Sequence, residues 1–253
     1  MLQDLLSQLA TPAMPLRPSS LGQFIKCPMS VALKMIQDYG DSDGNAGAQT
    51  GTLVHKAVEA FHKKGGGRDN ALATFQEWKD KIEKADKKKA EEWLLAYLAD
   101  PKNQEAVVTH LEFPVTLDWK GVYVKGTLDQ IRYEDGVYRV WDLKTGKYLD
   151  RGGAKAEYQF QQAGYVLAAR QTTGLDVQPG GLIWCQGYDQ PRGNPFIELN
   201  VSVEDCEAKL DRVVERVEEL RQGKLIFLPS DSACKFCPFK QYPDCSNQAR
   251  SLL

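Results

Sequence analysis

The sequence lacks any hydrophobic run that approaches the roughly 18 residues needed to cross a membrane. Its first 15 residues lack the basic start of a secretory signal peptide and are interrupted by Pro12 and Pro15. Internal repeats and long low-complexity tracts are also missing. We therefore expect an intracellular, cytoplasmic protein that does not associate with a membrane.

Net charge is low as well. The formal net charge is −2, while 26% of the residues are charged and 42% are hydrophobic, values typical of a globular chain and not of a disordered one. This balance neither favours nor excludes nucleic acid, because binding depends on where the charges lie. Any DNA-binding surface must therefore be a local stripe. The most basic segment carries six lysines that form either a solvated helix face, which we favour, or a DNA contact; they are Lys79, Lys81, Lys84, Lys87, Lys88 and Lys89.

The pattern of hydrophobic residues predicts a mixed α/β (α+β) chain. Helices are predicted over residues 20–37, 51–64, 69–99, 155–172 and 203–222. Segments rich in Val, Tyr, Thr and Trp, separated by turn residues, predict strands over 107–119, 122–133, 137–143, 181–188 and 195–203. The central order is therefore helix, three strands, helix, strand, followed by an irregular tail.

The dipeptide Asp135-Gly136 predicts a tight β-hairpin, because both central residues of a type I′ turn need positive φ. With these two residues as the loop, Asp129 lies directly opposite Asp142. Directly opposed residues share a face of the sheet, with Cβ atoms about 4.5–5.5 Å apart. Lys144 is two residues beyond Asp142 and projects from the same side. The turn therefore brings two carboxylates and one ammonium group together.

Two opposed carboxylates repel each other unless a cation lies between them. Carboxylate oxygens suit Mg²⁺ or Mn²⁺, and such an ion can polarise a phosphodiester and lower the pKa of a bound water. Lys144 is then placed to stabilise developing negative charge or to orient the attacking water. The alternative is a surface hairpin whose Asp142 and Lys144 are solvated or weakly paired, and the short Asp-Leu-Lys motif alone does not decide between them.

Four short motifs occur in the order found in the PD-(D/E)XK nuclease superfamily. They are Gly51-Thr52-Leu53-Val54-His55 with Glu59, Gly126-Thr127-Leu128-Asp129, Val140-Trp141-Asp142-Leu143-Lys144-Thr145-Gly146, and Gln161 with Tyr165. The ordered set resembles the RecB-like branch and covers roughly residues 17 to 246. The resemblance implies a restriction-endonuclease-like αβββαβ core. We expect a single nuclease domain over 1–253, with a helical N-terminal part (17–105), a central sheet with helices (106–222) and a cysteine-rich tail (223–253).

Carried over residue by residue, the resemblance implies a metal site and a catalytic lysine. The metal ligands would be His55, Asp129, Asp142 and the backbone carbonyl of Leu143. Lys144 would be the catalytic lysine.

Other residues would support this site. Gln161 and Tyr165 would hold the DNA backbone or the region of Lys144, with Gln159 and Gln162 as alternatives to Gln161. Glu59, one helical turn after the histidine, is either a partner that orients it or an ordinary surface charge.

The six cysteines are Cys27, Cys185, Cys206, Cys234, Cys237 and Cys245. In a reducing compartment, clustered cysteines more often bind metal than form disulfides. Cys234 and Cys237 have the C-x2-C spacing that lets two thiolates reach one metal centre, and Cys245 follows within reach. A fourth ligand is needed, and Cys27 is the best candidate.

Residues 16–28 resemble the opening of RecB-like nucleases that carry an iron–sulfur staple, such as the AddB nuclease domain and the CRISPR-associated adaptation exonuclease. The resemblance implies a [4Fe-4S] cluster on Cys27, Cys234, Cys237 and Cys245. The gap before Cys245 is longer than is usual in those relatives, which leaves the fourth ligand open, and zinc also suits four thiolates. Cys185 is expected to be a buried core residue, and Cys206 is given no role.

The resemblance implies a Mg²⁺- or Mn²⁺-dependent deoxyribonuclease, an exonuclease acting on single-stranded DNA or DNA ends in recombination, repair, or phage or CRISPR DNA processing. One alternative is a DNA-end-binding or scaffolding protein that retains the nuclease fold. Another is an adaptation factor that works with recombination or CRISPR proteins in an integration complex. A complete set of His55, Asp129, Asp142 and Lys144 favours the enzyme, because a pure binder usually has a degenerate site.

Overall fold

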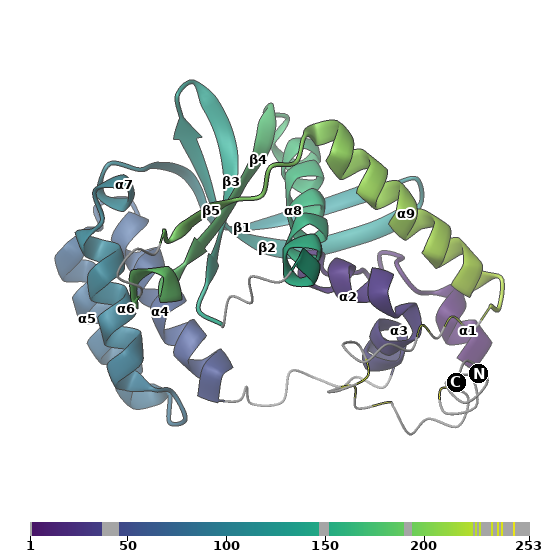
Figure 1. Ribbon diagram of the computed structural model, residues 1–253, viewed down its shortest axis with the longest axis horizontal. Coiled ribbons are helices and arrows are strands. Elements are labelled where there is room, and N and C mark those ends of the chain that lie inside the picture. Colours follow the sequence, from purple (N-terminus) through teal and green to yellow (C-terminus); the bar gives the residue numbers. More distant parts are fainter. Residues whose placement is uncertain are drawn as a thin grey trace.

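A mixed five-stranded sheet lies at the centre of the molecule, in the strand order β1-β2-β3-β4-β5 (Figure 1). The computed structural model describes residues 2–36, 46–146, 152–189 and 194–224, and also residues 226, 228, 234, 237, 239 and 245. Strands β1 (Val107–Trp119), β2 (Val122–Glu134) and β3 (Val137–Lys144) form an antiparallel meander. Strand β4 (Val177–Trp184) is parallel to β3, and β5 (Phe196–Glu198) is antiparallel to β4.

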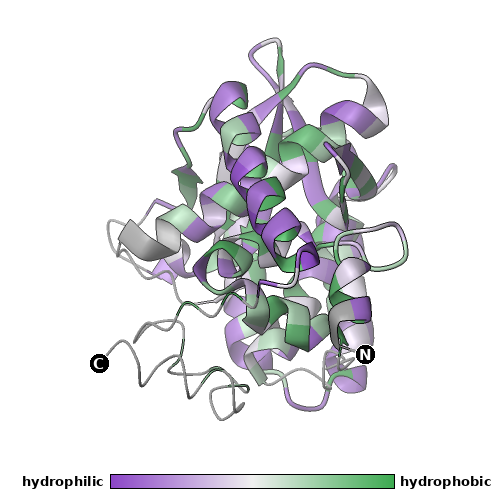
Figure 2. Cartoon of the chain, turned by 90° about the vertical axis from the view of Figure 1, so that its right-hand side faces the viewer, coloured by the Kyte–Doolittle hydropathy of each residue, from purple (hydrophilic) through white to green (hydrophobic). Residues whose placement is uncertain are grey.

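One group of helices covers one face of the sheet. It consists of α1 (Leu2–Ser7), η1 (Pro18–Ser20), α2 (Leu21–Lys26), α3 (Pro28–Ile36), α8 (Gly152–Thr173) and α9 (Val203–Arg221). Helix α8 joins β3 to the parallel strand β4, as such a crossover requires. Hydrophobic residues recur along α9 at helical spacing and are buried, and Figure 2 shows hydrophilic residues interspersed with hydrophobic ones on the helices of this side.

A second group of helices covers the opposite face. It consists of α4 (Ala46–His62), α5 (Arg68–Lys81), α6 (Lys87–Ala99) and α7 (Pro101–Gln104), at the left of Figure 1. Alternate residues of β3 serve the two faces, because Val140 joins the core under α8 and α9 whereas Trp141 and Leu143 join the core under α4 to α6. The two helical groups therefore meet the sheet from opposite sides.

The predicted order of helix, three strands, helix and strand is confirmed by α4, β1–β3, α8 and β4. The three meander strands agree with the prediction to within a residue at each end. A 3-10 turn, η2 (Cys185–Asp189), follows β4. In the part of the chain that the structure describes, no helix has both the length and the apolar composition needed to span a bilayer.

Two predicted helices are wrong in that each is divided. The helix predicted over 69–99 is interrupted between α5 and α6, where Asp86 accepts a hydrogen bond from the backbone N–H of Lys89 at 3.0 Å and so caps a new helix. The helix predicted over 20–37 is interrupted at Cys27, which is extended because the following Pro28 disfavours helical geometry.

The last strands also differ from the prediction. Strand β4 covers 177–184 instead of 181–188, and β5 covers 196–198 instead of 195–203. Gly180 and Gly181 are typical of a turn, yet here they lie within a strand. A Cβ atom at either position would collide with the backbone of Val140 or Ile197, so these glycines permit the close approach of neighbouring strands.

Candidate active site

The β2–β3 hairpin has the turn and the register predicted from the sequence. Asp135 and Gly136 have φ values of 50° and 82°. The ladder pairs Glu134 with Val137 and ends with Gln130 opposite Trp141. The next pair in this register is Asp129 with Asp142. Asp129 Oδ2 also accepts a hydrogen bond from the backbone N–H of Leu143 at 2.6 Å, which joins the two strands at the level of the carboxylates.

A third carboxylate, which the sequence reasoning missed, lies beside Asp129. The β1–β2 ladder pairs Leu111 with Gln130 and Phe113 with Leu128, so Glu112 is opposite Asp129. Glu112 has φ 44°, in the left-handed region that non-glycine residues rarely adopt and that is often found at functional sites. Three carboxylates therefore lie in a row across three neighbouring strands.

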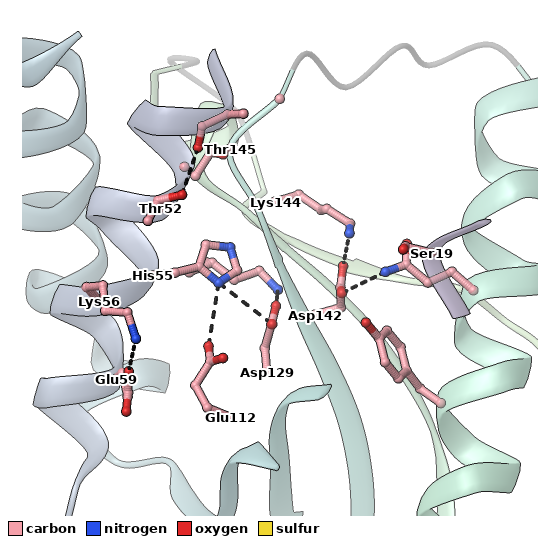
Figure 3. A pocket seen from close by; sticks show the side chains of 16 residues that line it. Ser19, Thr52, His55, Lys56, Glu59, Glu112, Asp129, Asp142, Lys144 and Thr145 are labelled. Carbon is pink, nitrogen blue, oxygen red and sulfur yellow. Dashed lines mark hydrogen bonds and ion pairs between the residues drawn. The ribbon is translucent and has the colours of Figure 1, made fainter. Parts of the chain in front are cut away.

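His55 on α4 faces this row of carboxylates. Its Nδ1 atom is 3.7 Å from Glu112 Oε1 and 3.7 Å from Asp129 Oδ1 (Figure 3). Ligand atoms of these three residues lie within 4.8 Å of one another, close enough to share one ion. Gly51 allows α4 to approach the end of β3, because a Cβ atom there would lie 2.6 Å from Thr145 Oγ1.

Asp142 is the most buried acid of the site, with 3% of its surface exposed. Gln161 on α8 donates a hydrogen bond to Asp142 Oδ1 at 3.0 Å, and Lys144 Nζ lies 2.5 Å from Oδ2 (Figure 3). Despite this ion pair, Oδ2 accepts no hydrogen bond of good geometry. The amides of Gln159 and Gln162 bond to backbone carbonyls instead, so Gln161 is the glutamine that faces the site.

The charges of these groups depend on one another. Burial raises the pKa of Asp142 to about 6, with Lys144 opposing and Asp129 adding to the effect. Burial lowers the pKa of His55, but the negative charges of Asp129, Glu112 and Asp142 outweigh burial and raise this pKa to about 9. Burial also acts to lower the pKa of Lys144, and the same aspartates raise it above its usual value. Burial also raises the pKa of Asp129, so both aspartates are easier to protonate than in water, and a divalent ion beside them would favour their ionised forms.

These residues line a cavity of about 510 Å³ between α4 and α8. Tyr165 also lines it, and burial raises the pKa of its hydroxyl, which therefore stays protonated. Lys144 Nζ lies 5.6 Å from the ring centroid of Tyr158, a neighbour that the sequence reasoning did not identify. Glu59 pairs with Lys56 of its own helix at 3.0 Å and with Lys63, directly after the helix, at 3.8 Å.

A buried hydrogen-bond network holds α4 against β2. The hydroxyl of Tyr97 accepts hydrogen bonds from Gln130 Nε2 and Arg132 Nη2, both at 3.1 Å, and lies 2.7 Å from His62 Nε2. Burial and the charge of Arg132 lower the pKa of His62 to about 3, so this imidazole is neutral. Because α4 and β2 carry the histidine and the first aspartate of the site, the network fixes their relative position.

Three of the cysteines assigned to a metal cluster, Cys27, Cys234 and Cys237, lie close enough to Cys245 to act on its charge, but no three of these four described cysteines have sulfur atoms that lie within 4.8 Å of one another. Cys27 and Cys245 are buried, whereas Cys234 and Cys237 are partly buried, and no cysteine forms a disulfide. Burial raises the pKa of Cys245. The neighbouring thiols of Cys234, Cys27 and Cys237 raise it further, each by a smaller amount. The rest of the predicted tail lies mostly outside the described residues.

The two remaining cysteines belong to the hydrophobic cores. Cys206 packs in the core under α8 and α9, and Cys185 packs in the core under α4 to α6, as predicted for the latter. The lysines of the basic segment largely pair with carboxylates, which agrees with a solvated face; the pairs are Lys79–Glu91, Lys81–Glu77, Lys88–Glu92 and Lys89–Asp189.

Comparisons with known proteins agree with this architecture. The family model of the PD-(D/E)XK nuclease superfamily matches residues 15–242. Among solved structures, a "putative exonuclease" from Eubacterium rectale is similar, with a TM-score of 0.56 and 14% sequence identity over 97% of this chain and 90% of that chain. At this identity the likeness shows a shared fold. No curated protein matches the chain.

Proposed function

The chain belongs to the PD-(D/E)XK nuclease superfamily, and we propose that it is a metal-dependent deoxyribonuclease, an exonuclease that hydrolyses phosphodiester bonds in single-stranded DNA or at DNA ends. One observation carries this proposal. Three carboxylates lie in a row across β1, β2 and β3, with an imidazole on one side and the Lys144 ammonium on the other.

The donor set fits Mg²⁺ or Mn²⁺. His55, Asp129, Asp142 and the backbone carbonyl of Leu143 would hold the ion, and Glu112 is a further candidate ligand. The buried Oδ2 atom of Asp142, which accepts no well-formed hydrogen bond, is an oxygen that such an ion would satisfy. When bound, the ion polarises the phosphodiester and lowers the pKa of a coordinated water.

The chain's own residues then act on the phosphate. Lys144 keeps its proton near neutral pH, so its ammonium stabilises the negative charge that grows on the phosphate oxygens as water attacks and the leaving oxygen departs. The protonated hydroxyl of Tyr165 is a hydrogen-bond donor to a phosphate oxygen. Gln161 is a positioning residue, because it holds Asp142 through Oδ1.

We also propose that the four clustered cysteines hold a [4Fe-4S] cluster, with zinc as the alternative. The neighbouring thiols raise the pKa of Cys245, and a bound metal centre would offset this effect by stabilising the thiolate. The cluster would join the segment after α2 to the C-terminal tail.

Two other functions remain as alternatives. The first is a DNA-end-binding or scaffolding protein, and the second is an adaptation factor acting with CRISPR or recombination proteins. Both can use the same fold without catalysis. The proximity of Lys144 to Asp142, together with the histidine and the two other acids, favours the enzyme.

The test is digestion of end-labelled single- and double-stranded DNA with and without Mn²⁺. Asp142→Asn and Lys144→Ala should each lower the cleavage rate by about 10²–10³-fold, the usual effect of removing one group that stabilises charge in the transition state. Lys125→Ala, which removes an exposed lysine of β2 outside the cavity, should leave the rate unchanged. A wild-type protein that binds DNA and cuts none with Mn²⁺ would favour the binding alternatives.

A further inference from the structure

A second cavity continues from the active site along α4. Its volume is about 380 Å³, and it lies between α4 and α5. Lys56 and Glu59 line both cavities, so the two are contiguous. The chemistry proposed above uses none of the groups that line the second cavity alone.

The amphipathic character of α4 explains this continuity. Leu53, Val54, Ala57 and Val58 are buried against the core. Residues three or four apart share a helix face, so Lys56 and Glu59 follow one another along the opposite side, and Lys63 comes directly after the helix ends at His62. The six residue steps from Lys56 to His62 cover about 9 Å, so a strand bound along this face would place successive nucleotides on it.

An aromatic ring lies on the far side of this cavity. Trp78, near the end of α5, is partly exposed and lines the cavity. Two ammonium groups lie over its ring, Lys56 Nζ at 5.7 Å and Lys81 Nζ at 5.3 Å from the centroid. A base that stacks there therefore takes the place of an ammonium, which is then free to contact a phosphate. A ring on which a base can stack, with cations beside it for phosphates, is the combination used by grooves that bind single-stranded nucleic acid.

The charges around the cavity favour a polyanion. Lys56, Lys63 and Lys64 line it against Glu59 and Glu77. Glu59 is shared between two lysines, whereas Lys64 is exposed and has no ion-pair partner among the described residues. Exposed ion pairs contribute little stability, so phosphates can recruit these lysines at small cost.

We propose that this second cavity is a subsite for single-stranded DNA, where one base stacks on Trp78 and the phosphates beside it contact Lys63 and Lys64. The inference rests on the proposed function, because it takes DNA as the substrate. A base must leave its duplex stack to reach the indole, which favours a single strand over a duplex. The subsite would hold the nucleotides next to the scissile phosphate.

Binding can be tested without cleavage, by fluorescence anisotropy of a labelled single-stranded oligonucleotide in Ca²⁺. Trp78→Leu keeps an apolar side chain for folding and should weaken binding about tenfold, since stacking of one base contributes that order of affinity. Duplex binding by this variant should be unchanged. The proposal would be overturned if Trp78→Leu bound single-stranded DNA as tightly as the wild type does. It would also be overturned if the variant lost as much affinity for duplex DNA as for single-stranded DNA.

The lysines have a matched control. The double variant Lys63→Gln/Lys64→Gln should reduce the slope of log affinity against log salt concentration by about 1.4, which corresponds to two phosphate contacts on a single strand. Lys87→Gln/Lys88→Gln removes the same charge from α6, outside both cavities, and should leave the slope unchanged. Similar slopes for the two double variants would contradict the assignment.

A small activated phosphodiester separates this proposal from the proposed function. Bis(p-nitrophenyl) phosphate is too small to reach both cavities, so Trp78→Leu should hydrolyse it with Mn²⁺ at the wild-type rate. A variant that loses this hydrolysis as well has a damaged catalytic centre, which would contradict a separate subsite. If the wild-type protein binds single-stranded DNA as expected but cleaves neither DNA nor bis(p-nitrophenyl) phosphate, the proposed catalysis is contradicted and the proposed subsite is not.

Discussion

At the scale of single residues, the candidate site balances charges that a metal ion would rearrange. In the metal-free protein the imidazole of His55 is a cation near neutral pH, held in that state by Asp129, Glu112 and Asp142. This protonation stabilises the fold, a contribution fully present below the unfolded pKa of about 6.5 and lost as the pH rises through about 9. An imidazole that binds a metal must be neutral, so the proposed ion would compete with this proton for His55.

The competition predicts a pH dependence of metal affinity. The apparent affinity for Mn²⁺ should rise about tenfold per pH unit between roughly pH 6.5 and 8.5, because one proton leaves His55 for each ion bound. Below about pH 6 the dependence should steepen as Asp142 also takes up a proton. Calorimetric titration over this range measures the slope.

His55→Gln supplies the control, because glutamine does not titrate and the slope above pH 6 should become nearly flat. The chain has three histidines, so proton NMR can follow His55 directly in the metal-free protein. A wild-type affinity independent of pH, or a His55 pKa near its ordinary value, would contradict the arrangement of charges described for the site.

At the scale of elements, the two-residue turns determined which of the acidic residues could be placed from the sequence. Asp135-Gly136 fixed the register of β2 on β3 and so placed Asp129 opposite Asp142. The same reasoning applied to Lys120-Gly121, both with positive φ, would have placed Glu112 opposite Asp129. That acid was missed because Lys-Gly is a less distinctive turn signal than Asp-Gly.

Other features depend on contacts that local sequence does not contain. The predicted boundaries of β4 were wrong because Gly180 and Gly181 are needed where strands that are distant along the chain approach each other closely. The choice among three glutamines on α8 was left open for a similar reason. Only the packing of α8 on the sheet selects Gln161 as the partner of Asp142.

The buried network around Tyr97 gives a prediction at this scale. Tyr97→Phe removes one hydroxyl and leaves Gln130 Nε2, Arg132 Nη2 and His62 Nε2 without that partner in the interior. The free energy of unfolding should fall by about 1–3 kcal/mol, since buried polar groups are costly when unsatisfied. Urea denaturation measures this change.

Tyr133→Phe is the matched control, because Tyr133 is 42% exposed and the same atom is removed from a partly solvated ring. Its unfolding free energy should stay within about 0.5 kcal/mol of wild type. Equal losses in the two variants would show that the network around Tyr97 does not hold α4 against β2.

At the scale of the whole molecule, the candidate active site lies between the two helical groups. His55 comes from the group around α4, whereas Gln161 and Tyr165 come from α8 on the other side. The first group also contributes the proposed strand subsite between α4 and α5. A DNA strand that reaches the metal centre would therefore contact both groups.

The N-terminal segment is joined to the rest of the chain in more than one way. Leu16 pairs with Val124 along the edge of β2 that β3 leaves uncovered, and Arg221 Nη2 donates to the carbonyl oxygen of Leu9 at 2.8 Å. The proposed cluster on Cys27, Cys234, Cys237 and Cys245 would add a link from this segment to the tail. Loss of the cluster should therefore destabilise the protein without unfolding the sheet.

Metal analysis tests this link. The purified protein should contain about four iron atoms per chain and be brown, and Cys27→Ser or Cys234→Ser should lose both the iron and the colour. Thermal stability should fall by about 5–15 °C, because a link between distant segments contributes roughly 2–5 kcal/mol. Cys206→Ser is the control, since this buried cysteine is not one of the four proposed ligands and the variant should retain the iron. Active, colourless protein with one zinc per chain would replace the iron–sulfur assignment with a zinc site on the same four cysteines.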